Sequence, residues 1–550
     1  MSSDKESHIE EIDTESQPPQ GFTQQSGEEA SVATQTSDSP HGNDRQLTNR
    51  KSRFSLFGSS QEGPIPLMGE GRPYPPKLEN PEIYKVSFDG PDDPLHPLNW
   101  PVKRKVFVCC ILGWVTFSSI WGSAIYAPAG LGVQEEFHIG EVTSILGLSL
   151  YVLGFASGPV LWGPLSELVG RKIPFVVACF LCMVFTFAVA AAKDVQTVML
   201  SRFFAGFAAG ANLAIVPASF ADLFDTSTRG RAMSIFATLI FTSPILAPIA
   251  GGFITYSNLG WRWTEYLTGI FLAAGLVLAV FFARETYQPV ILQHKAAEIR
   301  QKTGNHAIYA PHDLVKVDLK ELFQKYFSRP IVMLIVEPIL FLVTLYMAFI
   351  YGLLYLLLEA YPVIFGPGGY NFYKGTVELP YLSMFIGMVS AQLIVLFYFE
   401  PKYVKIFHAK GLIPEERLPP MIVGAFLLPL GIFWLTWTGH YHETVHFMVP
   451  AVSGVLIGAS VMFVFMPGLN YLIDTYLVVA ASAMAATTFL RSICGACFPL
   501  FAPGMFHRLG TNWAGTVLGC IAVVMVPVPI LFYYFGRRIR NHSRFAANKR

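Results

Sequence analysis

The stretch VFVCCILGWVTFSSIWGSAIYA at residues 106–127 decides the fold class, because it is apolar over the length of a membrane span. Eleven further runs of similar length follow it, and the last reads TVLGCIAVVMVPVPILFYY at residues 516–534. A helix that crosses the hydrocarbon core of a bilayer needs about 20 apolar residues, and 52% of this chain is hydrophobic whereas 14% is charged. The sequence therefore predicts an all-α integral membrane protein with twelve transmembrane helices. We expect these helices over residues 105–127, 141–162, 173–193, 196–221, 231–256, 263–284, 330–359, 379–399, 419–438, 447–474, 478–503 and 514–536.

The charges between these helices indicate the orientation of the chain. If the N-terminus is cytoplasmic, the inner loops and the C-terminal tail hold 25 Lys and Arg from Lys103 onward. The outer loops then hold four, which are Lys193, Arg262, Lys374 and Arg508. Because cytoplasmic loops carry the excess of basic residues, both termini are predicted to lie in the cytoplasm.

Two segments are too polar to enter the membrane. Residues 1–95 contain too few large apolar side chains to build a core, which predicts a disordered cytoplasmic tail. Residues 286–329 carry mixed charge and predict a cytoplasmic linker with one or two short surface helices. The linker divides the membrane part into two six-helix bundles, 96–285 and 330–536, and residues 537–550 form a basic cytoplasmic tail.

The two bundles share short sequences at matching places. NLGWRW (258–263) precedes the sixth expected helix and RLGTNW (508–513) precedes the twelfth, while APIAGGF ends the fifth and APGMF ends the eleventh. Weak internal similarity of this kind is typical of transporters built from structural repeats. The bundles are therefore predicted to be pseudo-symmetric.

The connection between the second and third expected helices reads GPLSELVGRK at residues 163–172. Gly163 and Gly170 suit the tight reversal that a loop of about ten residues requires. Glu167 can approach a positive helix N-terminus, and Arg171 can pair with an acid across the cytoplasmic face. Asp222, at the inner end of the fourth expected helix, is the candidate acid.

A cation lies within the fourth expected helix, in the stretch LSRFFAGFAAG at residues 200–210. Arg202 is about 6 residues, or roughly 9 Å, from the outer end of that helix. A charge at such a depth costs about 2.5–3.5 kcal/mol on insertion scales, and an intramembrane charge is a functional candidate by default. The alternative is that Arg202 extends to the outer headgroups. Small residues on the same helix predict close packing against a neighbouring helix.

The fifth expected helix contains the stretch TLIFTSPILAPIAGG at residues 238–252. It resembles an antiporter motif of exporters, in which a glycine precedes Gly-Pro-x-x-Gly-Gly. Thr238 and Ala247 stand at the two earlier glycine positions, and alanine is still small enough for close packing. The expected kink residues are Pro244, Pro248, Gly251 and Gly252.

These motifs together resemble the major facilitator superfamily. The segment 163–172 is similar to its signature loop, and the stretch around Arg202 is similar to its proton-coupling motif. Three further stretches resemble sequences of the fungal twelve-span drug:proton antiporters, which include multidrug and polyamine exporters. They are PDDPLHPLNWP before the first helix, GWRWTEY before the sixth and NYLIDTY at the end of the tenth. The resemblance covers about residues 85–540. It implies the major facilitator fold, export coupled to protons, and a cytoplasmic latch of the outward-facing state around Arg171 and Asp222.

The same resemblance implies that the first, fourth, seventh and tenth helices line a central cavity. The candidate substrate-contacting residues there are Tyr126, Asn212, Tyr355 and Asn470. Because the first helix has no carboxylate, the proton carrier is expected to be Glu359 or Asp474, with Glu337 and Asp222 as further options. Glu359 is favoured by its place near the outer end of the seventh helix, and a carboxylate in a weakly polar cavity can hold a proton near neutral pH. Asp474 has an alternative role as a helix end cap. Arg202 is expected to influence whether the nearby acid holds a proton.

The predicted function is a proton-coupled antiporter that exports amphipathic drugs, polyamines or related organic cations by alternating access. A nutrient uptake transporter and a non-transporting membrane sensor remain as alternatives. The sequence shows no catalytic constellation and no P-loop, so an enzyme or an ATP-driven pump is not expected. We expect no metal and no cofactor, since the two Cys-x-x-Cys pairs lie within apolar helices, where cysteine packs as a small hydrophobe. The expected partners are the small-molecule substrate, protons and the lipid bilayer, without nucleic acid, for a monomer in the plasma membrane or, alternatively, the vacuolar membrane.

Overall fold

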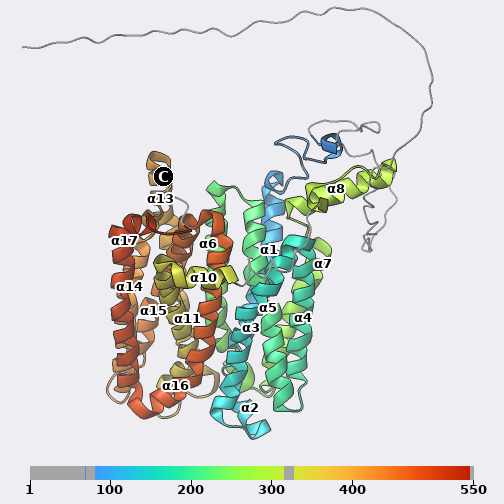
Figure 1. The fold of residues 1–550 in the computed structure, drawn as a ribbon. Coiled ribbons are helices and arrows are strands. Elements are labelled where there is room, and N and C mark those ends of the chain that lie inside the picture. The colour runs from blue at the N-terminus through green and yellow to red at the C-terminus, as the bar shows by residue number, and fades with distance from the viewer. Residues whose placement is uncertain (1–67, 70–80, 315–327, 546–550) are drawn as a thin grey trace, which may run out of the picture. The chain divides into compact units, whose positions relative to one another are not determined.

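The computed structural model describes residues 68–69, 81–314 and 328–545, all within the compact unit Pro64–Arg550. The predicted disordered tail falls outside the described residues over 1–67 and 70–80, as do linker residues 315–327 and residues 546–550. Figure 1 shows long helices that lie beside one another. We call the helix ends where α1 (Val102–Ala124) begins and α17 (Pro527–Arg540) ends the tail face, and the opposite ends the far face.

Six long helices form the N-terminal half of this unit. They are α1, α3 (Glu141–Val169), α4 (Lys172–Ala190), α5 (Val195–Leu223), α6 (Thr226–Thr255) and α7 (Arg262–Phe282), with the short α2 (Gly130–Phe137) between α1 and α3. The shortest of the six, α4, has 19 residues. At about 1.5 Å per residue it extends roughly 28 Å, which is close to the thickness of a hydrocarbon core.

The described part of the C-terminal half has five long helical segments, several of them interrupted, and the last is long enough for two spans. They are α10 (Arg329–Val336) with α11 (Pro338–Phe365), α12 (Tyr381–Ile394) continued through η6 (Val395–Phe399) into α13 (Glu400–Lys410), α14 (Pro419–His440), α15 (Met448–Thr475), and α16 (Ala480–Met525) with α17. The break before α11 lies at Glu337, whose backbone is extended. The cause is Pro338, since a proline disfavours helical geometry in the residue before it.

Gly510 divides α16 into two spans. Its backbone (φ 76°, ψ 163°) is not helical and lies in a region that favours glycine. Eleven described segments have the length and hydropathy of a span, and the last, Ala480–Arg540, has 61 residues, enough for two. Division at Gly510 gives twelve spans and confirms the predicted fold class. The eleventh helix continues to residue 509, beyond its predicted end at residue 503.

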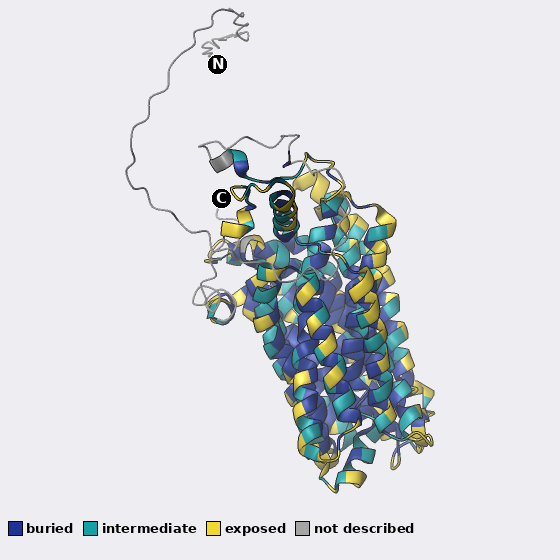
Figure 2. Ribbon diagram, turned by 90° about the vertical axis from the view of Figure 1, so that its right-hand side faces the viewer, coloured by how far each residue is buried: buried dark blue, intermediate teal, exposed yellow. Residues whose placement is uncertain are grey.

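The two halves pack internally and against each other. The pairs α3–α5 and α1–α6 are in contact in the first half, as are α11–α16 and α14–α15 in the second. Two seams join the halves, α3 against α16 and α6 against α12. Figure 2 shows buried residues along the interior and exposed residues on the outward surfaces. Apolar side chains such as Phe281 and Val524 are exposed there, as expected for a surface that contacts lipid.

The predicted small-residue face of α5 packs closely against α3. A Cβ atom added at Gly206 would collide with the backbone oxygen of Tyr151, and one at Gly210 would lie 3.1 Å from Cα of Gly158. Backbones that approach this closely require glycine.

The predicted boundary of the N-terminal tail at residue 95 is too late. Tyr84 and Val86 are buried in a small apolar cluster with α8 (Gln288–Thr303) and the segment that follows α8. The backbone amide of Val86 donates to the Tyr309 carbonyl (2.9 Å), and Lys295 Nζ lies 3.2 Å from a carboxylate oxygen of Asp89. The segment alone is too polar to form a core, and it folds because the linker supplies the other half of the cluster. The linker contains α8 and the short η3 (Pro311–Leu314), in agreement with the predicted surface helices.

Candidate transport site

Arg202 lies on α5, and its side chain is 0% exposed. The guanidinium donates hydrogen bonds to the carbonyl oxygens of Gly122 (2.7 Å), Ser123 (3.1 Å) and Gly147 (3.1 Å). Its Nη1 also lies 3.0 Å from Oε1 of Glu265, which is itself buried. The cation is therefore held by backbone groups of α1 and α3 and by a carboxylate on α7.

Two tyrosine rings cover the same guanidinium. Its Cζ atom is 4.4 Å from the ring centre of Tyr126 and 4.5 Å from that of Tyr151, within the range of cation–π attraction. Tyr126, predicted as a cavity residue, thus contacts Arg202. Because the cation is enclosed among helices, the alternative in which Arg202 extends to the headgroups is wrong.

Glu265 was not predicted as a site residue. It lies in the first turn of α7, where a carboxylate near a helix end has an ordinary interfacial explanation. Its partner is 63 residues away in the sequence, so no local spacing connects the two. The available signal was the rule that treats every intramembrane acid as a functional candidate.

Two serines of α1 contact predicted cavity residues, one within the N-terminal half and one across to the C-terminal half. Nδ2 of Asn212 donates to Oγ of Ser119 (2.8 Å), and Oγ of Ser123 lies 2.8 Å from the hydroxyl oxygen of Tyr355 on α11. Ser119 and Ser123 are four residues apart and share one helix face. The structure therefore brings two predicted cavity residues, Asn212 and Tyr355, to α1, and the carbonyl of the same Ser123 binds Arg202.

Glu359 lies one helical turn beyond Tyr355 on α11, toward the far face. Its side chain is half-buried, and its electrostatic neighbours are two other carboxylates, Glu141 and Glu378. Over residues 81–314 and 328–545, neither a hydrogen bond nor an ion pair connects Glu359 to a cation. This carboxylate differs in that respect from Glu265.

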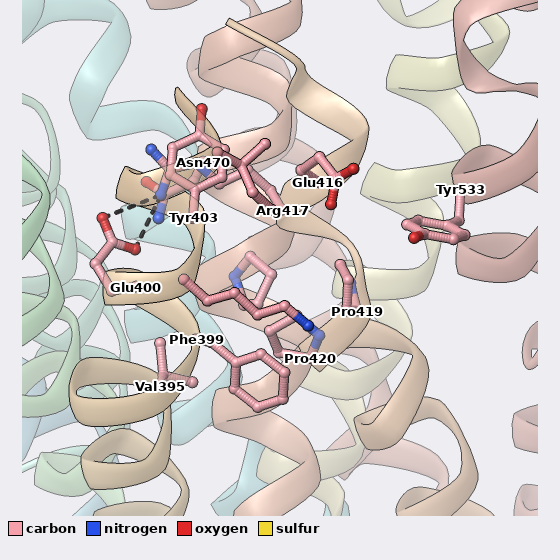
Figure 3. Close-up of a pocket in the computed structure, with 13 residues that line it drawn as sticks. Val395, Phe399, Glu400, Tyr403, Glu416, Arg417, Pro419, Pro420, Asn470 and Tyr533 are labelled. Atoms are coloured by element: carbon pink, nitrogen blue, oxygen red, sulfur yellow. Dashed lines mark hydrogen bonds and ion pairs between the residues drawn. The ribbon is translucent and has the colours of Figure 1, made fainter. Parts of the chain in front are cut away.

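Asp474 lies at the tail face in an ion-pair cluster with Arg417. Arg417 and Tyr403 also line a pocket of about 70 Å³ between α13, α14 and α15 (Figure 3). Arg417 lies 2.9 Å from Asp474 and 3.0 Å from Glu400, and the Tyr403 hydroxyl donates to Asp474 (3.0 Å). Asp474 thus lies at the end of α15 and accepts from Arg417 and Tyr403, and its role as an end cap stays a prediction. Asn470 lines the same pocket, away from the layer that contains Asn212 and Tyr355.

The predicted pairing of Arg171 with Asp222 is present at the tail face. Nε of Arg171 lies 3.2 Å from Oδ2 of Asp222, and the guanidinium is 4.6 Å from the ring centre of Tyr287. Asp222 is the last residue but one of α5, as Asp474 is of α15. Each half therefore ends one helix with an arginine, an aspartate and a tyrosine in contact, as the predicted pseudo-symmetry requires.

The segment 163–172 differs from its predicted structure. α3 continues to Val169 and α4 begins at Lys172, so Gly163 is helical and the turn is only Gly170 and Arg171. The predicted loop over residues 163–172 is therefore too long, because α3 extends past the apolar core and its polar end resembles a loop in the sequence. Gly170 has φ +98°, and a Cβ atom there would collide with the Glu285 carboxylate.

Glu285 binds the N-terminus of α4, the role for which Glu167 is the predicted acid. Its carboxylate accepts hydrogen bonds from the backbone amides of Arg171 (2.8 Å) and Lys172 (3.1 Å), which a positive helix terminus favours. Glu285 belongs to the stretch ETYQPVILQHKA, which follows α7.

α6 is helical from Thr226 to Thr255 through both Pro244 and Pro248. Gly251 and Gly252 of this helix allow close contacts at the far face. A Cβ atom at Gly251 would lie 2.8 Å from the Ile125 oxygen, and one at Gly252 would lie 2.8 Å from Cγ of Glu378 in the other half. The predicted kink residues thus lie where α6 meets both α1 and the C-terminal half.

Twelve described spans in two halves, with a buried ion pair between helices, are typical of a membrane transporter. The sequence profile of the Major Facilitator Superfamily matches residues 112–499, and the chain belongs to this family. It is 48% identical to the multidrug transporter FLU1 of Candida albicans, over 91% of this chain and 82% of that one. It is 48% identical to the multidrug transporter TPO1_2 of Candida glabrata, over 88% of this chain and 83% of that one. Among solved structures, the xylose transporter XylE from E. coli aligns with a TM-score of 0.56 at 17% identity, over 79% of this chain and 98% of that one, which supports the fold.

Proposed function

We propose that this protein exports amphipathic drugs, polyamines or related organic cations in exchange for protons. The relatives named as multidrug transporters support the substrate class, because they match this chain over most of its length. The surroundings of Glu359 are the observation that supports proton coupling. Glu359 is an intramembrane carboxylate without a described cationic partner, one turn from the Tyr355 hydroxyl that reaches α1.

The proposed orientation places the tail face in the cytoplasm of a cell, with the protein as a monomer in the plasma membrane. Basic residues support this orientation, since the last turn of α17 carries Arg537, Arg538 and Arg540. Glu359 then lies near the outer surface, where protons arrive from an acidic exterior.

In this proposal Glu359 binds either a proton or the positive group of the substrate. A proton that arrives from outside displaces the cation outward, and its release to the cytoplasm frees the carboxylate for the next cation. The Arg202–Glu265 pair acts on this exchange through Ser123, whose carbonyl accepts from Arg202 and whose hydroxyl contacts Tyr355. Asp474 is assigned no proton, because Arg417 already compensates its charge.

The two clusters at the tail face act as latches in the alternating-access cycle. The Arg171–Asp222 pair and the Arg417–Asp474 pair hold helix ends together within each half. Across the seam, Gln392 of α12 donates to Ser234 of α6. Opening toward the cytoplasm requires this seam contact to break, whereas opening to the outside requires Gly252 of α6 to separate from Glu378 and Gly375 of the other half.

Efflux from loaded vesicles tests the proposal. The purified full-length protein is reconstituted in liposomes, and release of spermine and of rhodamine 6G is followed with and without an imposed pH gradient. The expected result is release that depends on the protein and accelerates with the gradient. Release of neither compound above protein-free liposomes would contradict an exporter of these classes, and gradient-independent release would contradict proton coupling.

A further inference from the structure

Arg491 is a second cation buried within the membrane part. It lies on α16, 11 residues after Ala480, or roughly 16 Å along the helix, which is near the middle of a hydrocarbon core of about 30 Å. Its side chain is 6% exposed. Neither the predicted proton pathway nor the tail-face latches use it.

Unlike the other buried cations, Arg491 has neither a carboxylate nor a carbonyl partner described among residues 81–314 and 328–545. In that part of the chain, Lys105 donates to a backbone carbonyl, and Arg202, Lys295 and Arg540 each pair with a carboxylate. Arg491 takes part in no described ion pair, and its buried Nε has no hydrogen-bond partner. Its described contact is the ring of Tyr351, 5.2 Å from the guanidinium carbon. A buried guanidinium with open donors is unfavourable, so this position suits an anion that the chain does not supply.

A row of aromatic side chains continues from the Tyr351 ring that contacts the guanidinium. Tyr351 has its ring centre 5.1 Å from that of Tyr355 and 6.3 Å from that of Phe465. Phe465 in turn lies 4.4 Å from Phe241 of α6. These rings come from both halves of the protein, so this aromatic layer (Tyr351, Tyr355, Phe241 and Phe465) lies where the halves meet.

Close packing holds Tyr351 beside Arg491. Gly495 is one turn further along α16, and a Cβ atom there would lie 2.9 Å from the Tyr351 ring and 3.1 Å from Val152 of α3. The absence of a side chain at Gly495 lets the Tyr351 ring lie close to α16. Tyr355, the next aromatic of the layer, contacts Ser123, so Arg491 lies on the same polar connection as Arg202.

We propose that Arg491 binds the anionic group of an exported amphipathic carboxylate, whose apolar body lies against the aromatic layer. A guanidinium matches a carboxylate through two parallel hydrogen bonds, and flat apolar bodies pack well against aromatic rings. This inference rests on the proposed export function and extends its substrates from cations to organic acids. Cations and acids are then recognised at different places, the cations at Glu359 and the acids at Arg491.

Binding of three probes with one apolar body tests the inference. The full-length protein in phosphatidylcholine nanodiscs is titrated with 1-pyrenebutyrate, 1-pyrenebutanol and 1-pyrenemethylamine, and the shift in melting temperature gives the apparent affinity. The wild type is expected to bind 1-pyrenebutyrate at least tenfold more tightly than the alcohol. Arg491→Gln should remove this preference and Arg491→Lys should keep part of it, because lysine retains the charge but not the planar fork. Arg508→Gln, an exposed position on the same helix, is the matched control and should keep the full preference.

Several results would overturn the anion site. One is an equal affinity of the wild type for the acid and the alcohol. Another is an unchanged preference for the acid in Arg491→Gln. A third is that sodium chloride alone raises the melting temperature as much as the acid does. If Arg491→Gln does not fold, an unaltered preference in Arg491→Lys overturns the bidentate site. Pyrenemethylamine efflux under a pH gradient is measured in parallel with liposomes. If pyrenemethylamine is exported but the acid is not preferred in binding, only this inference is refuted. If pyrenemethylamine is not exported but the acid is clearly preferred, only the export function is refuted.

Discussion

Replacing Glu265 with glutamine should destabilise the protein and stop transport. The change removes the only carboxylate described beside Arg202, and both side chains are almost completely buried. Removal of one partner from a buried pair leaves an uncompensated charge and costs about 3–5 kcal/mol. Arg202 keeps its three carbonyl partners, so we expect a value near the lower end, about 3 kcal/mol.

The double variant Arg202→Met/Glu265→Met separates stability from function. Exchange of a buried pair for apolar residues of similar volume is often neutral or stabilising by about 1–4 kcal/mol. The double variant should therefore melt at a higher temperature than Glu265→Gln alone, while transport remains absent in both. Arg202→Lys should restore only part of the transport, since it keeps the charge and loses the fork that reaches three carbonyl groups.

Thermal unfolding of the detergent-solubilised protein, followed by size-exclusion chromatography after heating, measures the stability of each variant. Efflux from liposomes that contain equal amounts of folded protein measures transport. Strictly additive losses in the double variant would show that Arg202 and Glu265 do not interact. Wild-type efflux in the double variant would remove the pair from the mechanism.

Three further outcomes follow from other contacts. Asp222→Ala should shift the balance between inward- and outward-facing states by up to about tenfold, or about 1.4 kcal/mol, because it breaks the ion pair with Arg171. Labelling of introduced cysteines from each side of the membrane measures this balance, and unaltered labelling would contradict the prediction. Burial alone would raise the pKa of Glu136, but the hydrogen bonds from Arg262 and Trp261 hold it below its ordinary value of 4.5. The stability that Glu136 contributes is therefore present above pH 4.5 and is lost as the pH falls through the pKa of the folded state. The difference in melting temperature between Glu136→Gln and the parent should shrink from about pH 7 to about pH 3. A difference that stays constant over this range would contradict the prediction. Val86→Ala should destabilise the cluster with α8 by about 2 kcal/mol and speed its cleavage in limited proteolysis without altering efflux per molecule; unchanged cleavage would mean that the cluster is not cooperative.

The spans were predictable because apolar length is a property of each segment alone. Lipid imposes about 20 apolar residues per helix, so the sequence indicated all twelve. Errors occurred where polar residues belong to helices that extend beyond the apolar core, as at Gly163 in α3, or where a fold needs two distant segments, as at Val86. Neither case leaves a local periodic pattern.

The candidate site was predictable only one residue at a time. Arg202 was conspicuous as a cation in an apolar run, whereas its partner Glu265 lies near a helix end and 63 residues away. The sequence around Asp474 is compatible with a proton carrier, whereas in the structure Arg417, 57 residues away, compensates its charge. Arg491 lies in the stretch ASAMAATTFLRS, and only the packing shows that it lacks an acid. Ion pairs between helices depend on the tertiary arrangement, which residue spacing along one helix does not encode.

Accumulation of spermine driven by a pH gradient in Glu359→Gln liposomes tests the central proposal most directly. Glutamine keeps the shape of the side chain and cannot release a proton, so the variant should lose accumulation against a spermine gradient while the protein still inserts and folds. Glu443→Gln, an exposed acid in the loop after α14, is the control and should accumulate spermine as the wild type does. Wild-type accumulation by Glu359→Gln would contradict the account.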